Sequence, residues 1–140
     1  MIAYFDTSAV IPLLVDEPGS DAAGDFWERA LRVVSVRLVR VEARAGLARA
    51  ARSERISWAQ LRSVVRQLDE LLDQLDFVEV DEELVRNAAD LAQSHSLRAY
   101  DAVHLAAALT AASDDLVVVA GDRALISAAS MAGLATGAIG

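Results

Sequence analysis

A chain of 140 residues with 54% hydrophobic content is long enough for one globular domain, spanning residues 1–140, and too short for two. It has no cysteine, which excludes disulfides, thiolate zinc sites and cysteine nucleophiles, and all 13 basic residues are arginine, which excludes every mechanism that needs a lysine. The net charge of −8 argues against non-specific binding to nucleic acid.

Strand-like and helix-like segments alternate along the chain. In chain order, the predicted elements are strand 2–5, helix 8–14, a helix carrying FWERAL (26–31), strand 33–36, helix 38–52, helix 57–75, strand 77–80, helix 81–95, helix 100–112, strand 115–121, helix 122–133 and a short strand in the tail. Ser20 or Asp21 is expected to cap the second helix, and Ser57 the fourth. This alternation predicts an α/β domain whose parallel sheet is covered on both faces. With no leader and no apolar run of about 18 residues, we expect a cytoplasmic protein without a membrane span.

Four acidic residues stand where predicted strands end or helices begin. Asp6 and Asp122 each follow a strand, and ligands of an open parallel sheet bind beyond the carboxyl ends of its strands. Asp101 opens an otherwise apolar helix, and Glu42 lies early in its helix on the same face as Arg49. Each acid alone could be a helix cap, a dipole partner or an ion-pair partner. Together they predict a cluster at one edge of the sheet.

Electrostatics then indicates what such a cluster needs. Two carboxylates about 5 Å apart repel by roughly 3 kcal/mol at an effective dielectric constant of 20. Some of the four must therefore be protonated, or cations must lie among them. Oxygen ligands suit Mg²⁺ or Mn²⁺, whereas two histidines and no cysteine disfavour zinc. Carboxylates holding one or two such ions perform phosphoryl chemistry, in which an activated water attacks phosphorus in line and leaves a 3′ hydroxyl and a 5′ phosphate.

Four stretches resemble the PIN-domain family, and within it the VapC toxins of bacterial toxin–antitoxin pairs. They are YFDTSAVIPLL, SVRLVRVEARAGLAR, LRAYDAVHLAAAL and LVVVAGDRAL, and they follow one another in the family's order across nearly the whole chain. The resemblance implies a flavodoxin-like three-layer α/β/α sandwich and Mg²⁺-dependent endoribonuclease activity on RNA. It also implies a homodimer and inhibition by a cognate VapB-like antitoxin.

The same resemblance assigns the family's metal-binding and catalytic acids to four positions. They are Asp6, Glu42, Asp101 and Asp122, of which Asp6 and Asp101 are expected to be the most direct ligands. Many relatives carry threonine or serine two positions before the last aspartate, but this chain has Ala120, so a hydrogen bond near Asp122 is expected to be missing.

Other polar residues near these motifs are expected to support them. Thr7 or Ser8 would hold a ligand water or orient Asp6, whereas His104 is expected to be structural and to bond a neighbouring element. Three arginines would hold substrate phosphates or balance charge: Arg49, Arg98 and Arg123. Two alternatives stay open, namely a PIN-type nuclease of RNA processing without an antitoxin and a catalytically silent interaction module.

Overall fold

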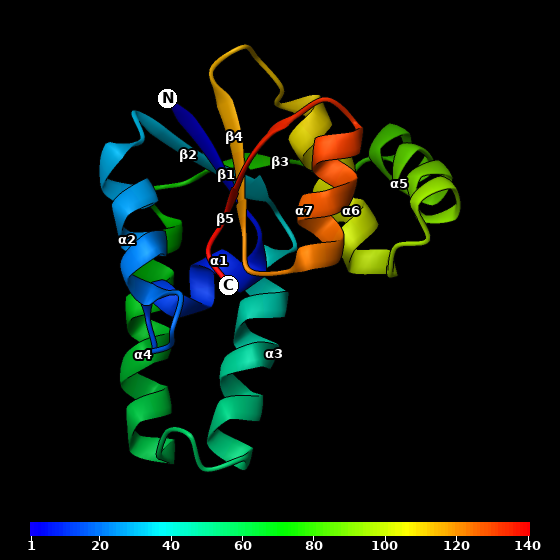
Figure 1. Ribbon diagram of the computed structural model, residues 1–140. Helices are drawn as coiled ribbons and strands as arrows, with labels where there is room; N and C mark the ends of the chain where they lie inside the picture. Colours follow the sequence, from blue (N-terminus) through cyan, green and yellow to red (C-terminus); the bar gives the residue numbers. More distant parts are fainter.

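The computed structural model describes residues 1–140 and contains a five-stranded, all-parallel sheet (Figure 1). The strands are β1 (Ile2–Phe5), β2 (Arg32–Val36), β3 (Asp76–Val78), β4 (Leu116–Ala120) and β5 (Ala135–Ala138), in the spatial order β3-β2-β1-β4-β5. The helices are α1 (Thr7–Val10), the 3₁₀ turn η1 (Ile11–Leu13), α2 (Ser20–Arg29), α3 (Val39–Arg52), α4 (Trp58–Leu72), α5 (Glu82–His95), α6 (Ala99–Thr110) and α7 (Arg123–Met131). The predicted α/β class and parallel sheet are confirmed.

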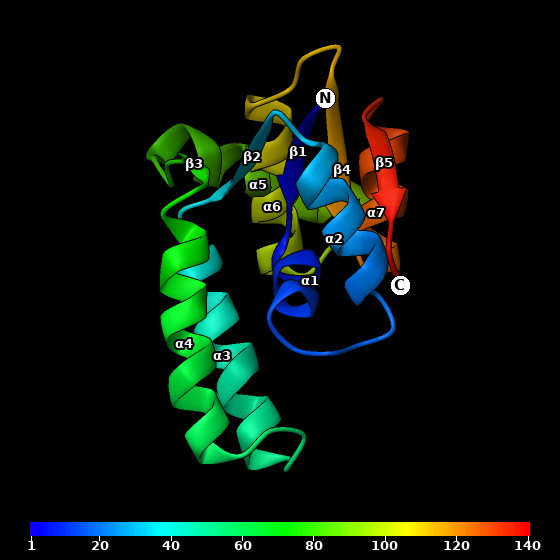
Figure 2. The same cartoon turned by 90° about the vertical axis from the view of Figure 1, so that its left-hand side faces the viewer.

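Helices cover both faces of the sheet, as the predicted three-layer sandwich requires (Figures 1 and 2). In central strand β1, Tyr4 belongs to the core beneath α5, α6 and α7, whereas Ala3 and Phe5 belong to the core beneath α1 to α4. Because successive side chains of a strand point to opposite faces, β1 is buried on both sides. This explains why its sequence reads as an unbroken apolar run.

Helices α3 and α4 form a hairpin that extends past the carboxyl edge of the sheet (Figures 1 and 2). The hairpin turns at Ser57, whose hydroxyl accepts from the Gln60 amide while the Gln60 side chain accepts from the Ser57 amide. This reciprocal capping box confirms Ser57 as the N-cap of α4. No helix is both long enough and apolar enough to cross a membrane.

Several local predictions are wrong. Neither Ser20 nor Asp21 caps α2, because Gly19 holds that position and the Ser20 hydroxyl donates to the Val15 carbonyl while accepting from the Glu17 amide. The first helix begins one residue early, at Thr7, and gives way to the 3₁₀ turn η1 instead of running on to residue 14. Strand β3 occupies residues 76–78 instead of 77–80 because only three residues pair with β2.

Candidate active site

Four acidic side chains from four different elements line one cavity of about 450 Å³. Asp6 joins β1 to α1, Asp122 joins β4 to α7, Glu42 lies in the first turn of α3 and Asp101 in the first turn of α6. Neighbouring parallel strands β1 and β4 end at the same edge of the sheet, which brings the two aspartates that follow them together. The predicted convergence of Asp6, Glu42, Asp101 and Asp122 is therefore present.

Asp6 is buried, with 3% of its surface exposed, although it precedes a helix. Its side chain does not cap α1. Instead Ser8 Oγ donates to Asp6 Oδ1 over 2.6 Å and accepts from the Gly121 amide over 2.8 Å. Burial raises the pKa of Asp6 to about 6, against the lowering effects of the His104 charge and the Ser8 hydrogen bond. The charges of Asp122 and Asp101 raise the pKa further.

The other two aspartates of the cavity, Asp101 and Asp122, differ from Asp6 and from each other in the groups that surround their carboxylates. Partial burial, followed by the charge of Asp122, raises the pKa of Asp101, while the Arg98 guanidinium 3.9 Å away opposes the shift. Asp122 Oδ1 accepts from the Leu125 amide over 3.1 Å and so caps α7. This cap uses only one carboxylate oxygen, so Asp122 can be a helix cap and a member of the cluster together.

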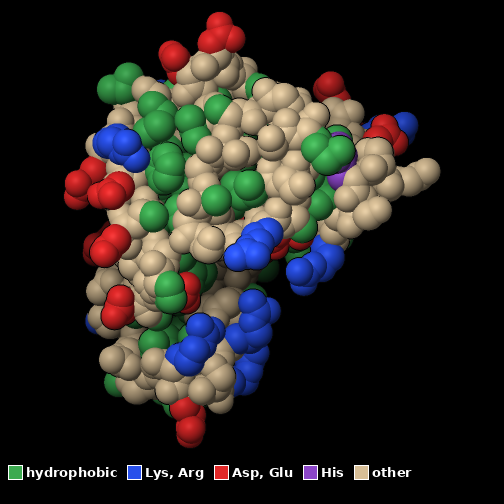
Figure 3. Space-filling view, in the orientation of Figure 1, with side chains coloured by type: hydrophobic (Ala, Val, Ile, Leu, Met, Phe, Trp, Pro, Cys, Tyr) green, Lys and Arg blue, Asp and Glu red, His purple; other side chains and the backbone are tan.

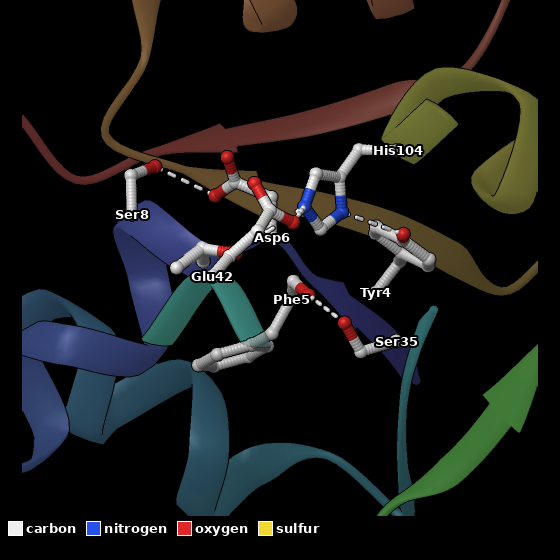
Figure 4. A network of polar contacts seen from close by, with 8 residues as sticks. Tyr4, Phe5, Asp6, Ser8, Ser35, Glu42 and His104 are labelled. Carbon is white, nitrogen blue, oxygen red and sulfur yellow. Dashed lines mark hydrogen bonds and ion pairs between the residues drawn. The ribbon is translucent and has the colours of Figure 1, made fainter. Parts of the chain in front are cut away.

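A buried imidazole ties Glu42 to the core (Figure 4). His104 is 1% exposed; its Nδ1 lies 2.8 Å from the Tyr4 hydroxyl, and its Nε2 lies 2.8 Å from Glu42 Oε1 and 3.3 Å from Thr7 Oγ1. Burial lowers the pKa of His104, but the Glu42 hydrogen bond and the charges of Asp6 and Glu42 outweigh it and raise the pKa above its ordinary value. The contacts agree with the structural role expected of His104, and they restrain Glu42.

Of the five polar residues predicted to bind substrate, four line the cavity and one does not. Thr7, Ser8, Arg49 and Arg98 line the cavity. Arg123 does not; it is exposed at the start of α7 and lines a smaller pocket, which Asp122 lines as well. Figure 3 shows basic side chains gathered around the hollow between α3 and the sheet, where acidic atoms are also visible.

Sequence reasoning missed two exposed apolar residues of the same cavity, Val41 and Tyr100. Each directly precedes one of the cavity acids in the sequence, and that adjacency is the signal that could have identified them.

The cavity acids and His104 offer only oxygen and imidazole ligands, and no three His, Asp or Glu side chains are arranged in this structure to bind one metal ion.

The raised pKa values of side chains at this cavity predict an unusual pH dependence of stability. Asp6 has a pKa of about 6 in the folded protein and 3.8 as a free side chain, so its effect reduces stability as pH rises across that interval. The pKa values of Asp101 and His104 are also raised. The stability that protonated His104 contributes below pH 6.5 is therefore lost as the pH rises through the pKa of His104 in the folded protein. We expect the melting temperature in EDTA to be higher at pH 5 than at pH 8.

Circular dichroism melts at constant ionic strength measure this dependence. The same melts in MgCl₂ provide the control, because a bound cation would take the place of the protons and reduce the slope. A melting temperature in EDTA that rises from pH 5 to pH 8 would contradict the prediction.

Residues 3–131 of the chain match the PIN domain family. Ribonuclease VapC45 of Mycobacterium tuberculosis (strain CDC 1551 / Oshkosh) is 38% identical over 132 residues, which cover 94% of this chain and 92% of that protein. Among solved structures, Mycobacterium tuberculosis VapC20, described as a sarcin-ricin loop cleaving toxin, has a TM-score of 0.71 at 18% identity, covering 94% of this chain and 95% of its own. A toxin–antitoxin complex from Klebsiella pneumoniae has a TM-score of 0.63 at 18% identity, covering 86% of each chain. These two structures share the fold, and the family match together with the identity to VapC45 establishes that the chain belongs to the PIN-domain family and, within it, to the VapC ribonucleases.

Proposed function

We propose that this protein is a Mg²⁺- or Mn²⁺-dependent endoribonuclease and the toxin of a toxin–antitoxin pair. The observation that carries the proposal is the convergence of four carboxylates on one cavity, where the pKa of buried Asp6 is raised to about 6. The 38% identity to ribonuclease VapC45 supports RNA as the substrate and a VapB-like protein as the antitoxin. As in the family, we expect a homodimer, and we expect it to act in the cytoplasm, where RNA and antitoxin meet.

The residues of the cavity fit a hard divalent cation. Mg²⁺ in proteins binds through one or two carboxylates and keeps several waters, so Asp6 and Asp101 suffice as direct ligands, with Glu42 and Asp122 acting through water or on a second ion. When bound, the ion supplies an activated water for in-line attack on phosphorus and stabilises the leaving oxygen. Ser8 orients the carboxylate of Asp6. His104 fixes one oxygen of Glu42.

We propose that two arginines of the cavity hold the RNA backbone. Arg49 on α3 and Arg98 before α6 line the cavity together with the acids. A guanidinium binds phosphate oxygens bidentately, so these side chains would hold the phosphates beside the scissile one. Arg123 lies outside the cavity and would reach only a more distant phosphate. When water attacks phosphorus in line with the 3′ oxygen as the leaving group, the bond between phosphorus and that oxygen breaks, which leaves a 3′ hydroxyl and a 5′ phosphate.

Cleavage of total RNA by the purified protein tests the proposal. We expect new RNA fragments in MgCl₂ or MnCl₂, none in excess EDTA, and 5′-phosphate ends on sequencing of the cleaved RNA. An Asp6→Asn variant purified in parallel excludes a contaminating nuclease. Cleavage that persists in EDTA contradicts the proposed chemistry, and absence of cleavage with either metal favours the silent interaction module.

The RNA-processing alternative would cleave in the same assay. It is separated from a toxin by expression in cells: a toxin arrests growth, and co-expression of its antitoxin restores it. Sequencing of RNA ends after expression would also identify the RNA that is cut.

A further inference from the structure

Two exposed apolar side chains border the acidic cavity, and carboxylate chemistry does not use them. Tyr100, in the first turn of α6, is 53% exposed, and Val41, in the first turn of α3, is 60% exposed. Both line the cavity, and each directly precedes a cavity acid, Asp101 or Glu42. Neither side chain is a buried member of the hydrophobic core. The exposure of Tyr100 and Val41 to the cavity therefore points to a ligand.

The cavity wall beside these two residues is made of small side chains. Ala45 and Gly46 of α3 and Ala99 of α6 line it and leave room for a bulky group. A cavity of about 450 Å³ falls in the size range of small-molecule and nucleotide sites. The carboxylates would repel an anionic group, but a neutral planar group on Tyr100 and Val41 meets no such repulsion.

We propose that Tyr100 and Val41 form a subsite for one unpaired nucleobase next to the scissile phosphate. This inference rests on the proposed ribonuclease function. Aromatic side chains bind single-stranded RNA by stacking on bases, and they do so for every base because each has a π-face. The Tyr100 ring supplies the stacking surface and Val41 supplies an apolar contact from a different helix, while Arg49 and Arg98 hold the backbone. Tyr100 is therefore a substrate-binding residue.

The subsite selects RNA by its secondary structure. A base inside a duplex is stacked on its neighbours and cannot reach a side chain at the rim of a cavity. An unpaired base in a loop can turn out of its stack and reach Tyr100. We therefore expect cleavage within single-stranded loops and little cleavage within duplexes.

The test compares Tyr100→Ala with Tyr100→Phe, which keeps the ring, and with Trp58→Ala, which removes an aromatic side chain of 57% exposure at the start of α4, outside the cavity. The substrate is a single-stranded oligonucleotide that contains the cleaved sequence, studied in MgCl₂. Loss of one stacked base weakens binding by about 30-fold, within a range of roughly 5- to 150-fold. We expect Tyr100→Ala to raise KM by that factor with little change in kcat, Tyr100→Phe, which keeps the stacking ring, to recover most of that loss, and Trp58→Ala to match the wild type.

A second substrate, with an abasic nucleotide on one or the other side of the cleaved bond, identifies the stacked base. On the abasic form that lacks this base, Tyr100→Ala and wild type should have equal KM, because the contact is already gone. Val41→Ser provides an independent variant with a smaller rise in KM. Melting temperatures should be unchanged, since both side chains are exposed.

The outcomes separate the inference from the function on which it rests. If the wild type cleaves the oligonucleotide and Tyr100→Ala does so with the same KM, the inference is wrong and the proposed function stands. The same conclusion follows if Tyr100→Ala cleaves normally but escapes inhibition by the antitoxin, because Tyr100 would then contact a protein. If the wild type cleaves no RNA with either metal, both the function and the inference fail.

Discussion

Replacing Asp6 with asparagine should reduce kcat for RNA by at least about a hundred-fold and, in EDTA, raise the melting temperature. Loss of a residue that only supports a metal ligand costs roughly 10- to 100-fold, so loss of a direct ligand should cost no less. The gain in stability follows from burial. The pKa of Asp6 is about 6 against an ordinary 3.8, and each unit corresponds to about 1.4 kcal/mol, so the ionised carboxylate destabilises the metal-free fold by roughly 3 kcal/mol at neutral pH.

Asparagine has nearly the same shape and keeps Oδ1 as an acceptor for Ser8, so the variant should fold. Thermal melts of wild type and Asp6→Asn, each in EDTA and in MgCl₂, measure both effects. We expect Mg²⁺ to raise the melting temperature of the wild type by several degrees and to leave that of the variant unchanged. Asp90→Asn, an exposed aspartate of α5, should resemble the wild type throughout. A variant less stable than the wild type in EDTA would contradict the cost assigned to the buried carboxylate, and a variant equally stabilised by Mg²⁺ would contradict the metal-site assignment.

The architecture could be predicted from the sequence because its signals are local. Runs such as 2–5 and 116–120 are apolar on both faces, and amphipathic segments separate them, so the parallel sheet follows from the order of the elements. The errors fall where a contact with another element decides the outcome. Ser20 bonds back to the loop before it instead of capping α2, and β3 ends where β2 stops pairing.

The four acids were predictable for a related reason. Each occupies a fixed place just after a strand or early in a helix, and a parallel sheet brings such places to one edge. Contacts between side chains distant in the sequence were not predictable in this way. His104 is 62 residues from Glu42 and 100 from Tyr4, so no local pattern shows that its ring joins them. Asp122 lines both the acidic cavity and a smaller pocket, but its neighbour Arg123 lines only the smaller pocket.

Replacing His104 with alanine should destabilise the fold strongly while reducing cleavage only moderately. The variant removes a fully buried ring and leaves a cavity, and it leaves the buried hydroxyl of Tyr4 without this partner. Large-to-small changes in a core cost about 2–5 kcal/mol, and an unpaired buried polar group about 1–3 kcal/mol. We therefore expect the melting temperature to fall by about ten degrees or more.

The effect on cleavage distinguishes a positioning residue from a general base. His104 Nε2 holds Glu42 Oε1, so its loss loosens one carboxylate of the cluster but removes none. Measured well below both melting temperatures, kcat should fall by about ten- to a hundred-fold, the usual cost of losing a residue that supports a ligand. His104→Gln, whose amide can still donate to Glu42, should recover part of this loss.

Tyr4→Phe separates the two contacts of the imidazole. It removes the hydroxyl that contacts Nδ1 of His104 and leaves the contact between Nε2 and Glu42 in place. It should reduce stability by about 1 kcal/mol and leave kcat nearly unchanged. The double variant Tyr4→Phe, His104→Ala should be less destabilised than the sum of the two single variants, because their shared hydrogen bond can be lost only once. If His104→Ala instead kept the wild-type melting curve and lost as much activity as Asp6→Asn, the imidazole would be acting on the substrate itself, and its assignment as a structural residue would be wrong.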